Sequence, residues 1–454
     1  MGKLIRIFER TQPINFLSPQ NEFNLYRSSF LSSELGLIYQ GIPWKELILS
    51  FGLKDKRHGP DSLFSPQGKL ALMFMKSYTN FSDRKLIESV NGNLHYQMFC
   101  GIILKAGETL KDFKIVSRIR TELGARFDLE DCQQVLARAW KPYMSQTHVM
   151  LEDATCYETQ MRYPTNVKLL WESVDWMYHQ MALMCKGCKI RIPRSKYLDQ
   201  KQKYFNYQRK RKKLRKERTK RTRSLLLLLN KLNGLLDELE QQLSGQTQMP
   251  AKYYSRRKVI RKVYRQQLQM FGTGESIPDR IVSISKFYIR PIVRGKEVKK
   301  VEFGAKVNTI QIDGLNFIEH LSFNAFNEGT RLKKSVWLAR QLFGKITHLA
   351  ADAIYATNAN RSYCTAKHIT TNFKRKGRAG KYEDQRQVIS RELNIERSTR
   401  MEGSFGTEKE HYSLQRIKAR TEQNEVLWIF FGIHTANLAR LAQRIKAKHH
   451  RKAS

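Results

Sequence analysis

The sequence is short of acidic residues, and this shortage sets its charge. Its 454 residues include 41 Asp and Glu against 82 Lys and Arg, so the formal net charge is +41. Self-repulsion on this scale weakens the compact state, and a polyanionic partner relieves it. With 41% hydrophobic residues the chain can bury a core, which excludes a disordered basic tail. We therefore expect nucleic acid as the partner, with an anionic membrane surface as the second candidate.

Cysteines, signal segments and long apolar runs are also scarce. Six scattered cysteines exclude a disulfide framework and favour a reducing compartment. Cys185 and Cys188 have zinc-knuckle spacing, but no second pair of ligands accompanies them. The N-terminus lacks the apolar core of a signal peptide. The most apolar stretch, EVLWIFFGIHTANLARLA from Glu425, contains polar and charged residues, so it predicts a buried helix. We expect a soluble cytoplasmic protein without a membrane partner.

Helix signals fill the first part of the chain. Ser65 and Pro66 are an N-cap and a first-turn proline, and Ser82 caps a second helix. A further helix is expected over 110–123, where Arg118 and Arg120 flank an apolar face. Short helices with tight turns and a basic last helix predict a DNA-binding domain of the helix-turn-helix kind. Any other small helical domain is the alternative.

From residue 147 the pattern changes to short apolar runs typical of buried strands. THVMLEDATCY is apolar on both faces, as a central strand is. Helices are expected over 331–342 and from about Arg397 and Glu425. The order of strands and helices predicts an α/β core with a mixed sheet. Four more strands are expected, at 279–289, 301–313, 345–352 and 368–373.

An intensely basic segment interrupts this core. QRKRKKLRKERTKRTR occupies 208–223, and leucines at heptad spacing follow from Leu225 to Leu243. A turn near Pro250 and a returning helix complete a predicted helical hairpin with one basic end. Charge of this density favours phosphate contact over an ordinary solvated face. The expected DNA-contacting residues here are Arg209, Lys210, Arg211, Lys212, Lys213, Arg215 and Lys216.

These patterns divide the chain into five segments. They are an N-terminal helical domain (1–140), the first part of the core (141–184), the basic insertion (185–275), the rest of the core (276–446) and a basic tail (447–454).

Three carboxylates stand where a phosphodiester-cleaving α/β core uses them. Asp153 interrupts the apolar row of the first strand, and Asp352 ends the buried run ITHLAAD, where α/β folds place their sites. Glu402 is expected on a helix, and Lys409, seven residues on, projects from the same side. Two divalent ions about 4 Å apart need such oxygen ligands. Asp313, at the end of another strand, is a rival for the second acid.

At these residues the chain resembles a known family. DATCYETQMRYPTNVKLLWES from Asp153, GAKVNTIQIDG from Gly304, LAADAIYATNANRSYC from Leu349 and EGSFGTEKEHYSLQRIKARTE from Glu402 resemble bacterial insertion-sequence transposases of the DDE class. LALMFMKSYTNFSDRKLIESVNGN and LKDFKIVSRIRTELG resemble the N-terminal domain of that group. The resemblance covers roughly residues 20–440, and it rests on the order and spacing of the motifs.

The resemblance implies a ribonuclease-H-like core in which Asp153, Asp352 and Glu402 hold two Mg²⁺ ions, for which Mn²⁺ can substitute. It implies cleavage at the inverted repeats that end the element, and transfer of the 3′ ends to target DNA. Lys409 matches a lysine that contacts DNA beside the cut. A homodimer is expected, because two ends must meet, and the heptads are candidates for its contacts. The expected location is the bacterial cytoplasm, at the nucleoid.

The match departs from the family pattern before the glutamate. Relatives often carry a tyrosine and an arginine seven and four residues before it, where this chain has Ile395 and Ser398. Arg397 and Arg400 stand close to the second position and are candidate DNA contacts, but one residue turns a helix by about 100°. Two alternatives remain: a related nuclease that cuts without strand transfer, and a non-catalytic, domesticated DNA-binding derivative.

Overall fold

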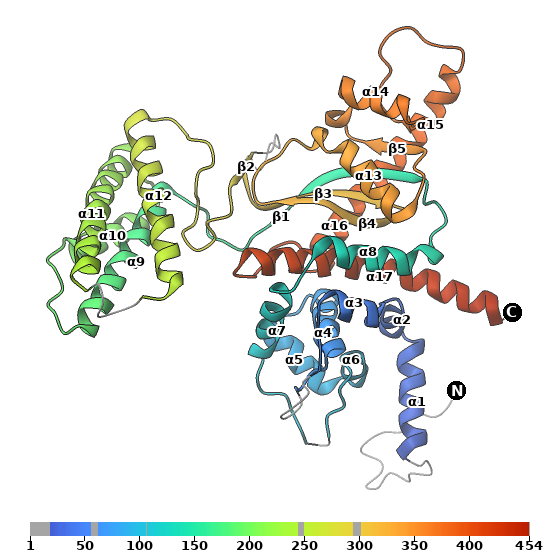
Figure 1. The fold of residues 1–454 in the computed structure, drawn as a ribbon, viewed down its shortest axis with the longest axis horizontal. Coiled ribbons are helices and arrows are strands. Elements are labelled where there is room, and N and C mark those ends of the chain that lie inside the picture. Colours follow the sequence, from blue (N-terminus) through green and yellow to red (C-terminus); the bar gives the residue numbers. More distant parts are fainter. Residues whose placement is uncertain (1–18, 56–61, 106, 244–248, 294–300, 454) are drawn as a thin grey trace.

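The computed structural model describes residues 19–55, 62–105, 107–243, 249–293 and 301–453. Figure 1 shows three parts: a group of N-terminal helices, a sheet with its covering helices, and a separate group of helices joined to the sheet by extended segments. Helices and a mixed sheet make up the fold, as the sequence predicts, and the whole is consistent with a ribonuclease-H-like transposase core.

The sheet is mixed, and β1 lies at its centre. β1 pairs antiparallel with β3 and parallel with β5, while β4 and β2 pair antiparallel with β3, and β6 pairs parallel with β5. Antiparallel strands on one side of β1 and parallel strands on the other give the topology expected of a ribonuclease-H-like core. The strands are β1 (Val149–Glu158), β2 (Pro291–Val293), β3 (Val301–Ile312), β4 (Leu315–Ser322), β5 (His348–Ala351) and β6 (Thr370–Thr371).

The N-terminal part is helical, as predicted, and its helix starts follow capping chemistry. The side chains of Ser65 and Ser82 accept hydrogen bonds from the backbone N–H groups of Gly68 and Lys85, so both predicted caps are present. The helices are α1 (Pro19–Ser32), α2 (Glu34–Gln40), α3 (Trp44–Ser50), α4 (Pro66–Thr79), α5 (Asp83–Gly92), α6 (Leu94–Phe99), α7 (Lys114–Gly124), α8 (Leu129–Trp140) and the short η2 (Lys141–Tyr143).

The C-terminal helix joins the N-terminal helices to the sheet. α17 runs between them in Figure 1, and one hydrophobic cluster contains Phe74 of α4, Phe317 of β4 and Phe430 of α17. The predicted buried helix from Glu425 is therefore confirmed. The remaining core helices are η3 (Glu328–Thr330), α13 (Leu332–Phe343), η4 (Ala353–Tyr355), α14 (Asn358–Ala366), α15 (Glu383–Glu396), η5 (Arg397–Met401), α16 (Glu402–His411) and α17 (Glu422–Ala453).

The inserted segment forms a four-helix unit instead of a bare hairpin. Its helices are α9 (Asn166–Gly187), α10 (Tyr197–Arg209), α11 (Arg215–Gln242) and α12 (Ala251–Thr273). One hydrophobic cluster runs through all four and already begins at Val167, before the expected boundary at 185. We call α9–α12 and their connections the inserted helical unit.

The heptad leucines are buried within this unit. Leu229, Leu232 and Leu236 have no exposed surface, and they pack in the same cluster as the methionines of α9. The expected use of these leucines as contacts between two copies of the chain is therefore wrong, because they already face their own neighbouring helices.

The predicted strand at 279–289 is wrong, and β4 was missed. Apolar residues of this segment are buried, but Ile281 and Ile284 enter the core of the inserted helical unit while Val282 and Ile289 enter the core beside β3. The segment therefore links two cores without joining a sheet. β4 follows a turn at residues 313–314, an Asp–Gly pair with both residues at positive φ, which is the chemistry of a tight hairpin.

Candidate active site

Strand register brings two of the predicted acids together. In the parallel pairing of β1 with β5, Glu152 lies opposite Ala351, so Asp153 and Asp352 are the next residues on neighbouring strands. Asp352 ends the β5 run, and its carboxylate accepts a hydrogen bond of 2.7 Å from the N–H of Ala353 at the start of η4. Both side chains therefore lie where the two strands diverge.

Burial and neighbouring charges act on the carboxyl of Asp153. Burial raises the pKa of Asp153 to about 6, and the nearby carboxylates of Asp352 and Glu328 contribute to the rise. The N–H of Ala154 and the guanidinium of Arg397 oppose it. Charged carboxylates this close favour a cation between them. Glu328, in η3, was missed in the sequence because it stands in no strand.

Arg397 connects Asp153 to the third predicted acid. Its Nη1 lies 3.2 Å from Oδ2 of Asp153 and 3.6 Å from Oε1 of Glu402. The Arg397 side chain is only 17% exposed, and its Nε is buried without a hydrogen-bond partner among the described residues. The three residues therefore lie on one side of β1. On this side Leu151 of β1 belongs to the same hydrophobic cluster as Met401 of η5.

A π-turn explains how an arginine five residues before the glutamate reaches it. η5, from Arg397 to Met401, is a π-turn directly before Glu402. Its i→i+5 bonding takes up one more residue per turn than an α-helix does. In a regular α-helix Arg397 would point away from the face of Glu402. The π-turn therefore brings the Arg397 side chain to Glu402, although its position in the sequence predicts that it points elsewhere. Arg400 instead pairs with Glu396 at 2.8 Å.

Lys409 approaches the same face of β1. Its Nζ donates a hydrogen bond of 2.8 Å to Oγ1 of Thr155 and lies 5.7 Å from the centre of the Tyr157 ring. Because side chains alternate along a strand, Thr155 and Tyr157 share a face with Asp153. α16 therefore delivers an ammonium group along the row that contains Asp153.

A buried polar network behind this face was not predicted. Glu152, fully buried, accepts hydrogen bonds from Asn308 of β3 and from Ser335 of α13. Burial raises the pKa of Glu152 to about 8, so the carboxyl is held largely in its neutral form near neutral pH. Tyr355 donates from its hydroxyl to Oδ1 of Asn308. The chain that follows Asp352 is thereby anchored to the centre of the sheet.

The rival acid Asp313 lies elsewhere. It stands beyond Ile312, at the opposite end of the β1–β3 pairing from the residues that follow Asp153. The Asp313 carboxylate pairs with Arg444 at 2.8 Å and accepts a hydrogen bond from the N–H of Ser145. It closes a hairpin turn and holds α17. Glu328, which influences Asp153, itself pairs with Lys306 of β3 at 2.8 Å.

The carboxylates of Asp153, Asp352 and Glu402 are of the kind that binds a hard divalent cation, but the described residues do not form a closed metal site. Among them, no three His, Cys, Asp or Glu side chains gather closely enough to hold a metal ion, Cys185 and Cys188 included. Asp153 and Asp352 supply carboxylate oxygens at the strand ends, and the Glu402 side chain, 59% exposed, is not held by packing. Carboxylate oxygens are the ligands that Mg²⁺ prefers.

The two arginines of α7 differ in their availability to DNA. Arg118 is 64% exposed and pairs with Asp112. Arg120 is only 9% exposed; it pairs with Asp83 at 3.0 Å, and its guanidinium lies 4.6 Å from the centre of the Trp428 ring. In this structure the charge of Arg120 holds α7 to α5 and α17, so its predicted DNA contact stays a prediction that this packing does not favour.

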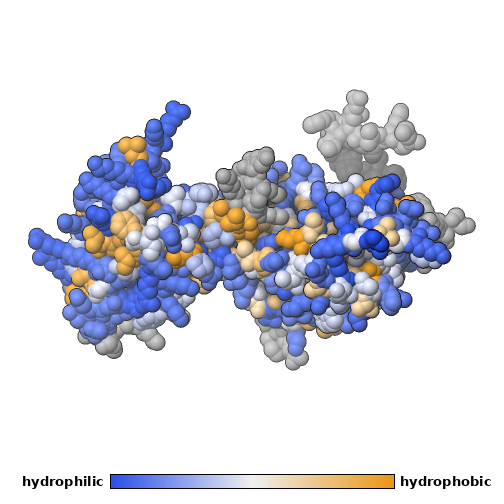
Figure 2. Space-filling model, turned by 90° about the horizontal axis from the view of Figure 1, so that it is seen from above, coloured by the Kyte–Doolittle hydropathy of each residue, from blue (hydrophilic) through white to orange (hydrophobic). Residues whose placement is uncertain are grey.

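The seven predicted DNA-contacting residues of the inserted helical unit are all exposed. They occupy the end of α10, the connection to α11 and the first turn of α11. Among the described residues only Lys210 of this group meets a carboxylate, that of Glu217. Figure 2 shows a face of the molecule that is largely hydrophilic, with scattered apolar side chains. The exposed group is Arg209, Lys210, Arg211, Lys212, Lys213, Arg215 and Lys216.

Comparisons with protein families bear on this arrangement. Residues 349–438 match the family model of the transposase DDE domain, and residues 27–122 match a transposase domain, DUF772. Both matches support an insertion-sequence transposase of the DDE class. No curated protein and no solved structure matches the chain closely enough to be compared with it.

The two matches cover separate parts of the chain. One covers most of the N-terminal helices, and the other runs from β5 into α17 and contains Asp352, Glu402 and Lys409. β1, with Asp153, and the inserted helical unit lie between the two matches. No helix in the described part of the chain is both long and apolar enough to cross a membrane.

Proposed function

We propose that the chain cuts DNA at the ends of its element and joins the 3′ ends to target DNA, with Asp153, Asp352 and Glu402 holding two Mg²⁺ ions. The observation that carries this proposal is the β1–β5 register, which sets Asp153 beside Asp352, together with the Arg397 link to Glu402. The match to a transposase DDE domain supports the reaction class.

The chain's own residues divide the work at the cut. The three carboxylates would hold the cations beside the attacked phosphodiester. Lys409, which reaches Thr155 beside Asp153, binds the phosphate next to the cut. Arg397 neutralises the acids before cations bind and then turns to the DNA backbone. When bound, the divalent ions lower the pKa of the attacking water or 3′-hydroxyl and stabilise the leaving 3′ oxygen.

The basic surfaces position the DNA. Arg118 on α7 and the exposed basic group of the inserted helical unit supply positive charge on two separate parts of the molecule. Phosphate contacts of this kind hold the duplex in place without reading its sequence. Two copies of the chain bring two DNA ends together in this proposal. The contacts between the copies come from surfaces other than the heptad leucines, which are buried.

Strand transfer separates this function from that of a nuclease with the same core. The purified protein is incubated with pre-cut element ends, supercoiled target DNA and Mg²⁺, and the joined product is measured on a gel. We expect joined product in Mg²⁺ and in Mn²⁺ and none in EDTA. Cleavage of uncut ends without any joined product would support the nuclease instead. Binding of the ends without either reaction would support a non-catalytic derivative.

A further inference from the structure

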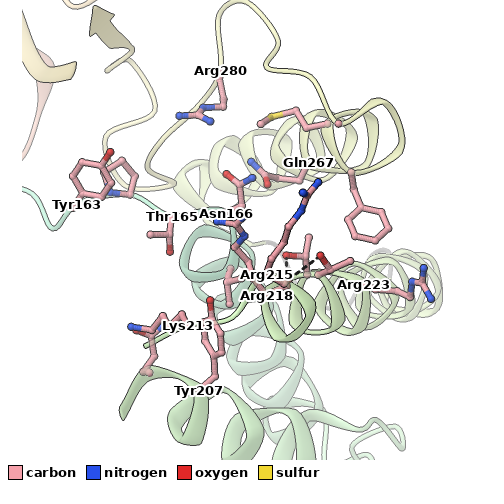
Figure 3. A pocket seen from close by; sticks show the side chains of 18 residues that line it. Tyr163, Thr165, Asn166, Tyr207, Lys213, Arg215, Arg218, Arg223, Gln267 and Arg280 are labelled. Carbon is pink, nitrogen blue, oxygen red and sulfur yellow. Dashed lines mark hydrogen bonds between the residues drawn. The ribbon is translucent and has the colours of Figure 1, made fainter. Parts of the chain in front are cut away.

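A cationic cavity of about 790 Å³ lies within the inserted helical unit, and none of the three acids of the core lines it. The ends of α10 and α12, the first turns of α11 and the loop before α9 surround it. Figure 3 shows Arg215 and Arg218 on one side, Arg280 across from them, and Gln267 and Tyr207 on the remaining sides.

The charge of the lining is of one sign. Five cations, Lys213, Arg215, Arg218, Arg223 and Arg280, line the cavity, and no carboxylate does. No ion pair is formed by any of the five within the described residues. Like charges placed this close repel each other, so the cavity favours a ligand with more than one negative charge. Phosphate groups meet this condition and pair with guanidinium groups in a bidentate manner.

A buried amide points into the same space. Gln267 of α12 is only 2% exposed, and its Oε1 has no hydrogen-bond partner among the described residues. In Figure 3 its side chain extends toward Asn166 across the cavity. A buried acceptor without a partner is unfavourable. An N–H group on a base edge can donate to this oxygen, whereas an ionised phosphate offers only acceptors.

Aromatic rings complete a surface for a planar ligand. Tyr207 of α10 and Phe271 of α12 line the cavity, and Lys213 and Arg223 lie 5.7 and 5.8 Å from the centres of those rings. Stacking of a base on an aromatic side chain favours binding of single-stranded nucleic acid. A cavity of this size belongs to the range that holds small ligands. A DNA duplex is too wide to enter it, but one or two unpaired nucleotides fit.

We propose that this cavity binds one or two unpaired nucleotides of the DNA, with the phosphates on the five cations and a base between Tyr207 and the Gln267 amide. The inference rests on the proposed DNA-cutting function for the source of the nucleotide. The inserted helical unit then does more than hold duplex phosphates: it distinguishes a frayed or single-stranded DNA end from a fully paired one.

Binding of two matched probes tests the proposal. One probe is a duplex with a short unpaired 3′ extension that contains 2-aminopurine, and the other is the same duplex with blunt ends. Affinities come from fluorescence anisotropy in EDTA, so that no DNA is cut. We expect the full-length protein to bind the extended probe about tenfold more tightly, with quenching of the 2-aminopurine emission by stacking.

Two substitutions on different helices address the cavity. Gln267→Leu removes the amide at similar volume, and Arg218→Gln removes a cation from the exposed part of α11 without disturbing the core. Each is expected to abolish the preference for the extended probe and to leave blunt-duplex affinity within about twofold. Gln269→Leu on α12 and Lys231→Gln on α11, both exposed and outside the lining, are expected to keep the preference.

The outcomes are separable from those of the cleavage reaction. Equal affinity for the two probes, or a preference that survives both cavity substitutions, would overturn the proposal. Displacement of the extended probe by a free mononucleotide such as ATP, bound as tightly as the probe itself, would show that the cavity serves a soluble nucleotide. That result would overturn the proposal that the ligand is part of the DNA. Failure of the strand-transfer assay bears on the proposed function alone, because these measurements need no cutting.

Discussion

At the scale of single residues, three carboxylates and one arginine form the proposed chemical centre. Asp153 and Asp352 owe their closeness to strand register, while Arg397 lies 3.2 Å from Asp153 and 3.6 Å from Glu402. We therefore expect a substitution at these residues to affect catalysis more than folding.

Neutral replacement of each acid tests the site. Asp153→Asn, Asp352→Asn and Glu402→Gln are each expected to reduce cleavage at least about a thousandfold, because each removes an anionic ligand at nearly constant shape. DNA affinity should stay within about threefold. Rates of nicking of end-containing DNA and gel-shift affinities are the measurements. Glu410→Gln, exposed on the same helix as Glu402, serves as the control and should cut normally. Full cleavage by any of the three acid variants would remove that residue from the site.

Arg397 is expected to matter more than its exposed neighbours. Arg397→Ala takes away the guanidinium between Asp153 and Glu402 and leaves both carboxylates without this counter-charge. We expect at least about a tenfold loss of cleavage, corresponding to about 1.4 kcal/mol in the transition state. Arg391→Ala, on the exposed side of α15, is the matched control. Identical cleavage rates for the two variants would contradict a role of Arg397 at the site.

At the scale of elements, α17 holds the N-terminal helices and the sheet in one core. Its His434 is fully buried among Trp140, Phe317 and Phe430, and its Nε2 has no partner among the described residues. Burial lowers the pKa of His434 from 6.5 to about 3. The folded protein therefore keeps this ring neutral at a pH where the unfolded chain protonates it.

His434 makes the stability of the fold depend on pH. The contribution of the neutral His434 ring to the unfolding free energy is fully present above about pH 6.5. It is lost as the pH falls toward 3, at about 1.4 kcal/mol per pH unit. His434→Leu should therefore flatten the fall of the unfolding free energy between about pH 6.5 and 5. Urea denaturation at several pH values measures this slope. His411→Leu, at an exposed position, should retain the slope of the natural chain. Parallel curves for the natural chain and His434→Leu would contradict the assignment.

At the scale of the whole molecule, the +41 charge is unevenly placed. Residues 208–223 alone, from the end of α10 into α11, carry eleven Lys and Arg against one Glu, which is a net charge of +10. Replacing Arg209, Lys210, Arg211 and Lys212 by Gln should lower the slope of log affinity against log salt. The expected decrease is about 0.9 for each phosphate that the variant no longer neutralises. Titration of duplex binding at several salt concentrations measures it.

A matched set of surface lysines controls for net charge. Lys333, Lys334, Lys345 and Lys367, all exposed on the core, change the charge equally when they are replaced by Gln. We expect this set to lower the salt slope by half as much or less. Equal slopes for the two quadruple variants would mean that the α10–α11 connection binds no more phosphate than the rest of the surface.

Local signals in the sequence were enough for much of the fold. The caps at Ser65 and Ser82, the strands that became β1 and β3, and the buried helix from Glu425 all follow from capping or periodicity over a few residues. The hairpin to β4 was available as an Asp–Gly turn and was missed. The strand predicted at 279–289 was wrong because buried residues are apolar whether or not they lie in a strand. Here the apolar residues enter two different cores.

The charge, the helical N-terminal part and the α/β core could be predicted from residue patterns, and the resemblance of the motifs led to the three candidate acids. Which polar residues are available to act depends on packing between distant segments. The tertiary structure buried Arg120 against Trp428, enclosed the heptad leucines within one unit, and turned Arg397 toward Glu402 through a π-turn. The physical reason is that propensity and spacing act over one or two turns, whereas burial, register and counter-charges depend on neighbours hundreds of residues away.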